Sequence, residues 1–383
     1  MTSTKNILII IKDKLNTVGG IVTYNKMLIE ILENNFQNVN IDIFLPDSST
    51  KDVNKDEVYK GVYKYYANTY NTKNIHINNL LHYIFSRKVI RNLLKVKKYD
   101  LILNSTDVFC NKNISTKNNY FLIQHNPLEL YKFKINKGFF AFIKRIIKKI
   151  FGARFAFDKT KNIILFDNKN KDLYWKSFKE NNNPNIYCIS LCSKNKQDVN
   201  IKKIIMYRKN IICFGRFTEQ KNIKEIIRIN NTINKVDFYG PKPSHLDKYG
   251  TNVFNFIEEK NWYKGVLDQD NLYTTINKYK FSINYSLFEG FGFSIVESLS
   301  CGVPVIVRDS FTSASFLTSY DHRLLIPKNA TNEEAIKQIN SLLNLSNEEY
   351  LELCKKAFKF FQENLSYEIF EKKWLEIFNK FLN

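Results

Sequence analysis

Short apolar runs rich in β-branched residues alternate with helical patterns through the first half of the chain. The runs cover residues 6–11, 40–45, 100–105, 119–125 and 162–167. Between the first two runs, apolar residues recur at helical steps on one face: Ile21, Tyr24, Leu28, Ile31 and Leu32. Strands that alternate with helices indicate parallel strands joined by crossover helices. This half is therefore predicted to be an α/β domain.

The pattern stops after a further predicted strand at 185–191 and then starts again. A polar stretch rich in Lys and Asn, 193–203, is expected to link two domains. Beyond it the sequence predicts strands at 210–215, 236–240, 280–286 and 303–307, and helices after Lys221 and near 294–300. A length of 383 residues also exceeds the roughly 250–300 residues that one core serves. We expect two doubly wound α/β domains facing each other across a cleft, residues 1–195 and 196–365.

The carboxyl-terminal part is predicted to be helical. Capping boxes that begin at Thr331 and Ser346 mark the starts of two helices. A last helix, 366–383, carries a wide apolar face made of Phe370, Trp374, Ile377, Phe378 and Phe381. Such a face needs a partner, so we expect this helix to pack back on the amino-terminal domain.

Composition and charge exclude several classes of protein. The six cysteines include no C-x-x-C pair, so neither a disulfide nor a metal site is expected. The sequence has no signal peptide and no apolar run of the ~18–20 residues that span a membrane, which predicts a cytoplasmic location. The net charge of +21 is compatible with nucleic-acid binding. Lys and Asn are abundant throughout, however, and no nucleic-acid-binding motif is present, so no such partner is expected.

The strongest chemical signal is SLFEGFGFSIVESLSCGVPVIV, residues 286–307. Two carboxylates, Glu289 and Glu297, flank Gly290 and Gly292 at a predicted strand-to-helix turn. Carboxylates accept hydrogen bonds from sugar hydroxyls, and glycines let backbone N–H groups approach a ligand. Open α/β sheets bind ligands at this carboxyl edge. A structural alternative remains, because Ser294 and Glu297 also have the spacing of a capping box.

A second motif supplies positive charge. In GRFTEQKN, Arg216 and Lys221 follow the predicted strand 210–215 at its carboxyl end. Both can reach the same crevice and stabilise the charge of a departing nucleoside diphosphate. The alternative is an ordinary solvated loop.

With these motifs the chain resembles the retaining glycosyltransferases of family 4, the glycosyl transferases group 1, which have the GT-B fold of two Rossmann-like domains. That family has a glycine pair after its first strand, then G-R-x-x-x-x-K, E-G-F-G-x-x-x-x-E and C-G-x-P-V. The matching positions here, in the same order, are Gly19-Gly20, Gly215-Arg216 with Lys221, Glu289 to Glu297, and Cys301 to Val305. Two positions depart from the family pattern: Tyr285 replaces a common proline and Asn222 a frequent glycine.

The resemblance implies a role for each domain and motif. The amino-terminal domain would bind the acceptor and the carboxyl-terminal domain the nucleotide sugar. The implied donor contacts are Arg216, Lys221 and Gly20 for the diphosphate, Glu297 for the ribose, and Glu289, Gly290, Phe291 and Gly292 for the sugar. His125 and Glu289 are the implied catalytic residues. Transfer would retain the anomeric configuration without a bound metal or other cofactor, and a UDP-sugar is the favoured donor.

A basic amphipathic segment, FFAFIKRIIKKIFG (139–152), has cations opposite an apolar stripe. This pattern is typical of a helix in a membrane interface. Its predicted membrane contacts are Phe139, Phe140, Ile143, Lys144, Arg145, Ile147, Lys148 and Lys149. The alternative is an amphipathic helix packed on the first domain.

Together these features predict a hexosyltransferase of surface polysaccharide or glycolipid synthesis. It would be peripheral at the inner face of the cell membrane and act on a lipid-linked or membrane-held acceptor. The alternative is a GT-B chain without catalysis that binds a glycan or stabilises a partner. Such a chain would be expected to lose a motif carboxylate or the Arg–Lys pair, and all four are present.

Overall fold

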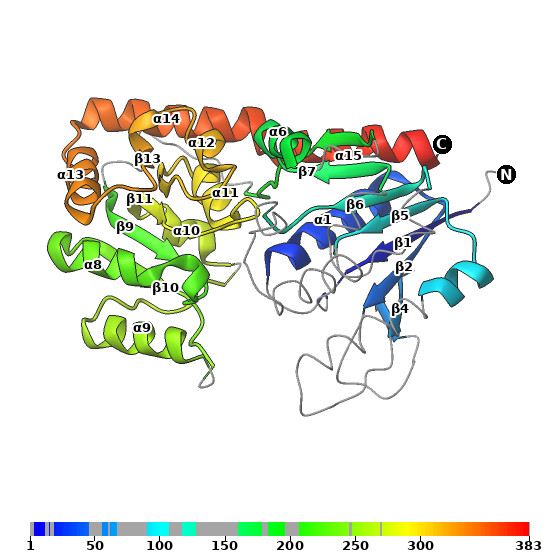
Figure 1. Cartoon of the computed structure of the whole chain (residues 1–383), viewed down its shortest axis with the longest axis horizontal. Coiled ribbons are helices and arrows are strands. Elements are labelled where there is room, and N and C mark those ends of the chain that lie inside the picture. Colours follow the sequence, from blue (N-terminus) through cyan, green and yellow to red (C-terminus); the bar gives the residue numbers. More distant parts are fainter. Residues whose placement is uncertain are drawn as a thin grey trace, which may run out of the picture. The chain divides into compact units, whose positions relative to one another are not determined.

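The computed structural model describes residues 4–11, 15, 19–45, 56–59, 62–66, 90–106, 117–127, 160–177, 183–195, 207–244, 247–268 and 270–382. The chain forms two compact units (Figure 1). Unit 1 comprises Met1–Ile189 with Glu371–Asn383, and unit 2 comprises Ser190–Phe370. The basic segment 139–152, with every side chain predicted to contact a membrane from Phe139 to Lys149, lies outside the described residues.

Unit 1 is built on one sheet. Its strands are β1 (Lys5–Ile10), β2 (Val39–Leu45), β3 (Asp56–Tyr59), β4 (Val62–Tyr66), β5 (Leu101–Asn104), β6 (Tyr120–Ile123), β7 (Asn162–Leu165) and β8 (Asn185–Cys188). Their order is β3-β4-β2-β1-β5-β6-β7-β8, and only β3 and β4 pair antiparallel among them. The chain moves outward from β1 to β2 and returns to β5 on the other side of β1. The carboxyl ends of β1 and β5 therefore form a topological switch point.

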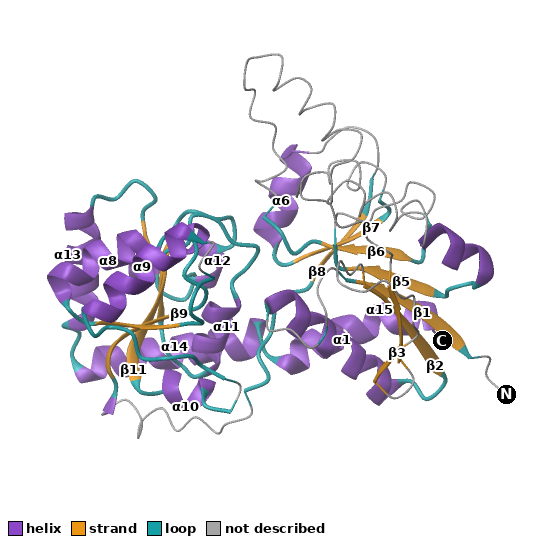
Figure 2. Cartoon of the chain, turned by 90° about the horizontal axis from the view of Figure 1, so that it is seen from below, coloured by secondary structure: helices purple, strands orange, loops and turns teal. Residues whose placement is uncertain are grey.

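Helices cover both faces of this sheet, as the alternation of side chains along buried parallel strands requires. On one face, Leu8, Leu122 and Ile163 form a core with Tyr174 of α6 (Asn168–Ser177). The opposite face is covered by α1 (Gly20–Asn35) and by α15 (Tyr367–Leu382) from Glu371 onward (Figure 2). The rings of Tyr24 in α1 and Trp374 in α15 lie 6.4 Å apart, and Trp374 is fully buried.

Unit 2 has a parallel five-stranded sheet. Its strands are β9 (Lys209–Phe214), β10 (Val236–Tyr239), β11 (Tyr279–Asn284), β12 (Val305–Arg308) and β13 (Leu325–Ile326), in the order β10-β9-β11-β12-β13. Because β9 lies between β10 and β11, this sheet also has a switch point, at the carboxyl ends of β9 and β11. The prediction of two doubly wound α/β domains is confirmed.

The helices of unit 2 also pack on both faces of its sheet. They are η3 (Glu219–Lys221), α8 (Ile223–Ile233), α9 (Lys248–Glu259), α10 (Leu272–Ile276), α11 (Phe293–Ser300), α12 (Ala314–Leu317), η4 (His322–Leu324), α13 (Asn332–Leu343) and α14 (Asn347–Asn364). Both predicted capping boxes are present, at Thr331 before α13 and at Ser346 before α14. Within the described part of the chain, no helix combines the length and apolarity needed to cross a bilayer.

Candidate functional site

A sharp turn at the end of β9 positions the two predicted cations. Gly215 has a φ of +137°, a conformation that side chains disfavour. Its N–H donates to the Tyr239 carbonyl at 3.0 Å, and a Cβ on Gly240 would lie only 2.0 Å from the Gly215 carbonyl oxygen. The ends of β9 and β10 are thus packed too closely for any residue but glycine at 240. The turn leaves Arg216 exposed, while Phe217 is buried and anchors the loop.

Lys221, from η3, forms an ion pair with Glu289, which lies in the loop after β11. Only 8% of Glu289 is exposed, and its Oε1 also accepts a hydrogen bond from Ser286 Oγ at 2.8 Å. The two motifs are far apart in the sequence, but β9 and β11 are neighbouring parallel strands. Their carboxyl ends therefore meet at the switch point of unit 2. Two residues predicted to contact the donor thus contact each other.

Further hydrogen bonds fasten these two loops together. The Leu287 N–H donates to the Gln220 carbonyl at 2.8 Å, and Gln220 Nε2 donates to the Phe288 carbonyl at 3.0 Å. The sequence reasoning missed both Ser286 and Gln220 as parts of the site. Ser286 could have been recognised from the sequence, since it lies two residues after β11, at the carboxyl edge of the sheet where α/β proteins bind ligands. Gln220 had none, because its role depends on a loop that is distant in the sequence.

The first turn of α11 opens toward the same edge without a side-chain cap. Its N-cap is Gly292, with a φ of +103°, and no side chain accepts a hydrogen bond from the backbone there. The capping box considered for Ser294 and Glu297 is therefore absent: the helix begins at Phe293, so Ser294 lies inside it and cannot be its N-cap. Phe291 is 1% exposed and packs on Phe316 with 6.2 Å between the ring centroids, so its side chain is not available to a ligand.

Glu297 lies on α11 and is partly buried. Burial raises its pKa to about 7, and the positive charge of Lys221 opposes the rise. A carboxyl group with this pKa is partly protonated near neutral pH, so it can donate as well as accept a hydrogen bond. Gly290 is partly exposed between the two carboxylates.

The remaining predicted residues, Gly20 and His125, belong to unit 1. Gly20 is the first residue of α1, and its N-cap, Gly19, supplies no side chain. His125 follows β6. Its ring centroid lies 4.9 Å from that of Tyr24 in α1 and 5.7 Å from that of Phe166. Its Nε2 is buried without a hydrogen-bond partner among the described residues, and burial lowers its pKa to about 3. His125 is therefore neutral at physiological pH.

The structure therefore brings Lys221, Glu289 and Glu297 together in unit 2, and places Gly20 and His125 near the switch point of unit 1. Arg216 has no ion-pair partner in the part of the chain that the structure describes. Among the same residues, no group of three or more His, Cys, Asp or Glu side chains is arranged to hold a metal ion.

Three solved structures are similar to this chain over almost its whole length. Sucrose-phosphate synthase from Thermosynechococcus elongatus superposes with a TM-score of 0.77 at 14% identity, covering 98% of each chain. WaaG, a glycosyltransferase involved in lipopolysaccharide biosynthesis, superposes at 0.70 and 11%, covering 96% of this chain and 98% of its own. Anabaena HepE, solved with UDP and glucose, superposes at 0.67 and 14%, covering 97% and 99%.

At these identities the likeness establishes the fold alone, and it is the GT-B fold of two Rossmann-like units. Comparison with curated proteins by sequence gives no significant match. Residues 194–360 match the model of the family described as "Glycosyl transferases group 1". That segment contains β9 to β13 and every predicted donor contact in unit 2. The chain therefore carries a glycosyl transferases group 1 domain within a GT-B fold.

Proposed function

We propose that this chain is a retaining glycosyltransferase that moves a hexose-type sugar from a UDP-sugar to a lipid-linked or membrane-held acceptor. The observation that carries the proposal is the Lys221–Glu289 ion pair at the switch point of unit 2, beside the uncapped start of α11. Open α/β sheets bind nucleotides at such points. The family match and the fold support glycosyl transfer, and HepE, which has the same fold, was solved with UDP and glucose.

Positive groups in unit 2 suit a diphosphate. Arg216 is exposed at the end of β9, and Lys221 is held in place by Glu289. The first N–H groups of α11 add a partial positive charge. Each charge-assisted hydrogen bond contributes about 1.5–3 kcal/mol. Together these groups would stabilise the leaving diphosphate without requiring a bound metal.

Carboxylates and backbone in the same place suit the sugar and the ribose. Glu289 is fixed by Lys221 and Ser286, so its remaining oxygen, Oε2, has a defined direction for a sugar hydroxyl. Gly290, Phe291 and Gly292 would contribute backbone groups, and Glu297 would bind the ribose. With a pKa of about 7, Glu297 can share either a donated or an accepted hydrogen bond with a hydroxyl.

His125 is proposed to act as a neutral hydrogen-bonding group near the donor sugar, together with Gly20 at the start of α1. Its low pKa excludes a role as an imidazolium acid at neutral pH. Retention would then follow from attack on the same face as the leaving group, with the donor phosphate assisting deprotonation of the acceptor.

Arg216→Ala is the direct test of this proposal. Loss of one charge-stabilising donor typically costs on the order of 10²-fold in turnover. Nucleotide release would be measured with a panel of sugar nucleotides and a membrane lipid extract. Arg228→Ala is the matched control, because Arg228 is an exposed arginine of α8 paired with Glu225. A loss of only about threefold at Arg216 would contradict its role. Absence of nucleotide release with every donor would favour the alternative, a non-catalytic glycan-binding or partner-stabilising subunit.

Peripheral attachment to the inner membrane face is proposed through the basic segment 139–152. The test is sedimentation with anionic vesicles at low salt. Replacement of Lys144, Arg145, Lys148 and Lys149 by Glu is expected to abolish binding, because each cation near an anionic leaflet contributes about 1 kcal/mol. Unchanged binding would refute the attachment.

A further inference from the structure

Unit 1 has a concave surface at the edge of its sheet opposite to His125 and Gly20. This pocket of about 800 Å³ is lined by Leu94, Lys95, Val96, Lys97, Lys98, Tyr99, Ile102, Lys117, Asn118, Asn119, Lys161 and Phe381. Most of these residues belong to the segments that lead into β5, β6 and β7, three neighbouring parallel strands. Their amino ends therefore share one edge, whereas His125 follows the carboxyl end of β6.

The charge of this basic pocket has one sign. Among the described residues that line it, five are lysines and none is Asp or Glu. Lys97 is already neutralised, since its Nζ lies 2.7 Å from Asp42, a buried carboxylate. The other four, Lys95, Lys98, Lys117 and Lys161, are exposed. None of these four has an ion-pair partner in the described ranges.

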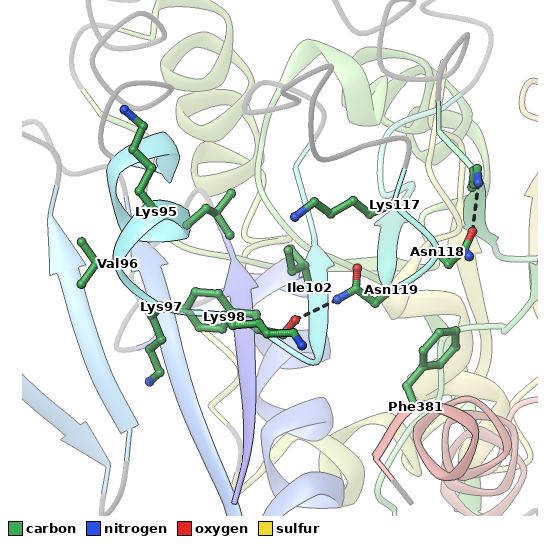
Figure 3. A pocket seen from close by; sticks show the side chains of 12 residues that line it. Lys95, Val96, Lys97, Lys98, Ile102, Lys117, Asn118, Asn119 and Phe381 are labelled. Atoms are coloured by element: carbon green, nitrogen blue, oxygen red, sulfur yellow. Dashed lines mark hydrogen bonds between the residues drawn. The ribbon is translucent and has the colours of Figure 1, made fainter.

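The walls of the basic pocket are held together by hydrogen bonds (Figure 3). Asn119 Nδ2 donates to the Tyr99 carbonyl at 2.8 Å, which joins the segments before β6 and β5. Lys161 Nζ donates to Asn118 Oδ1 at 3.0 Å, which joins those before β7 and β6. In Figure 3 the side chain of Lys117 extends toward the segment that carries Lys95 and Lys98. The lysines are thus presented by a fixed frame.

The floor of the basic pocket is apolar. Ile102 and Tyr99 are 1% and 4% exposed, and Phe381 packs on Phe121 with 5.3 Å between the ring centroids. A concave surface with one sign of charge and low-dielectric walls concentrates the electric field and attracts counter-ions. Lysine ammonium groups are compact point charges that suit phosphate oxygens. Several such groups around one pocket match a ligand that carries more than one negative charge.

We propose that the basic pocket binds a multiply charged phosphate group, on a soluble molecule or on a lipid headgroup. The proposal concerns unit 1 alone and does not depend on the sugar transfer proposed above. It also differs from the diphosphate site of unit 2, because it uses clustered ammonium groups at the amino ends of strands.

Binding of inorganic tripolyphosphate by isothermal titration calorimetry tests the soluble source. Co-sedimentation with vesicles that contain phosphatidic acid, whose phosphomonoester can carry two negative charges, is compared with phosphatidylcholine vesicles and tests the lipid source. Both use the full chain with Arg216→Ala, which weakens the diphosphate site proposed in unit 2. The test variant is Lys98→Ala with Lys117→Ala. Its control, Lys169→Ala with Lys176→Ala, removes the same charge from exposed positions of α6 in the same unit.

The test variant is expected to weaken binding to tripolyphosphate, to phosphatidic acid vesicles or to both by at least about tenfold, and the control by less than about threefold. Which probe responds identifies the source. In the protein that keeps Lys98 and Lys117, binding to the probe that responds should also weaken steeply with added salt. Equal losses in the two variants, or no binding of either probe, would overturn the proposal. Thermal unfolding of both variants shows whether the fold is intact, as expected for exposed side chains.

Discussion

The ion pair between Lys221 and Glu289 makes a quantitative prediction about both stability and activity. Lys221→Met and Glu289→Gln each remove one partner and leave the other in place. The Glu289 and Lys221 side chains are 9% and 20% exposed, so neither is fully solvated. Removing one partner of a fully buried pair costs about 3–5 kcal/mol, because the other charge stays buried and unpaired.

The partial exposure of Lys221 reduces this cost, and each single variant should lose about 2–3 kcal/mol of unfolding free energy. For a unit the size of unit 2, that corresponds to a fall in Tm of roughly 5–10 °C. The double variant should lose less than the sum, since no unpaired charge remains. The coupling energy is expected to be about 1–3 kcal/mol.

Urea unfolding of the wild type, both single variants and the double variant measures this coupling. The control cycle uses Lys359→Met and Glu363→Gln in α14, an exposed pair with 3.8 Å between Nζ and Oε1. There the coupling should stay below about 0.5 kcal/mol. Turnover should fall on the order of 10²-fold in all three variants at the site, the double variant included.

The reasoning fails if the coupling between Lys221 and Glu289 is no larger than that of the control pair. Recovery of turnover in the double variant would contradict the proposed contact of these two side chains with the donor. In that case the two side chains would only hold the loops together, and neither would contact the donor.

Three further predictions test other parts of the structure. Glu297→Gln should leave the free energy of unfolding unchanged near pH 4 and raise it at pH 8 by as much as about 3 kcal/mol. The reason is that Glu297 has a pKa of about 7 in the folded wild type, so the wild type loses stability as the pH rises from 4.5 through 7. Urea unfolding at a series of pH values measures this difference. The prediction is refuted if the wild type is as stable as the variant at pH 8. Trp374→Ala should cost about 3–5 kcal/mol, since this fully buried ring packs on Tyr24 in unit 1; a loss below about 1 kcal/mol would show that α15 is not part of that core. Gly240→Ala should cost at least about 2 kcal/mol, because its Cβ would collide with the Gly215 carbonyl, whereas Gly19→Ala has open space and should stay within about 0.5 kcal/mol; equal Tm values would contradict the close approach.

Local signals predicted the elements of the fold well. The predicted strands at 210–215 and 280–286 correspond to β9 and β11, and the capping boxes at Thr331 and Ser346 are present. These features depend on residues a few positions apart, so the sequence displays them directly. The strand β13 and the short helix α12 were not predicted, because they are too short to show a period.

The candidate site was predictable only in its parts. The motifs contained Arg216, Lys221, Glu289 and Glu297, but they did not show which of these side chains contact one another. A capping box was a serious alternative for Glu297, and only the start of α11 at Phe293 excluded it. The low pKa of His125 could not be read from the sequence either, because it results from burial against Tyr24 and Phe166.

Local sequence patterns established that the chain alternates strands and helices in two domains, and that the motifs predicted to bind a donor follow two strands of the second. The tertiary structure decided that Lys221 pairs with Glu289, that burial raises the pKa of Glu297, and that the lysines before β5, β6 and β7 surround one pocket. The reason is physical. Periodicity and capping act over one or two turns of chain, whereas charge pairing and desolvation depend on which strands are neighbours and on how deeply each side chain is buried.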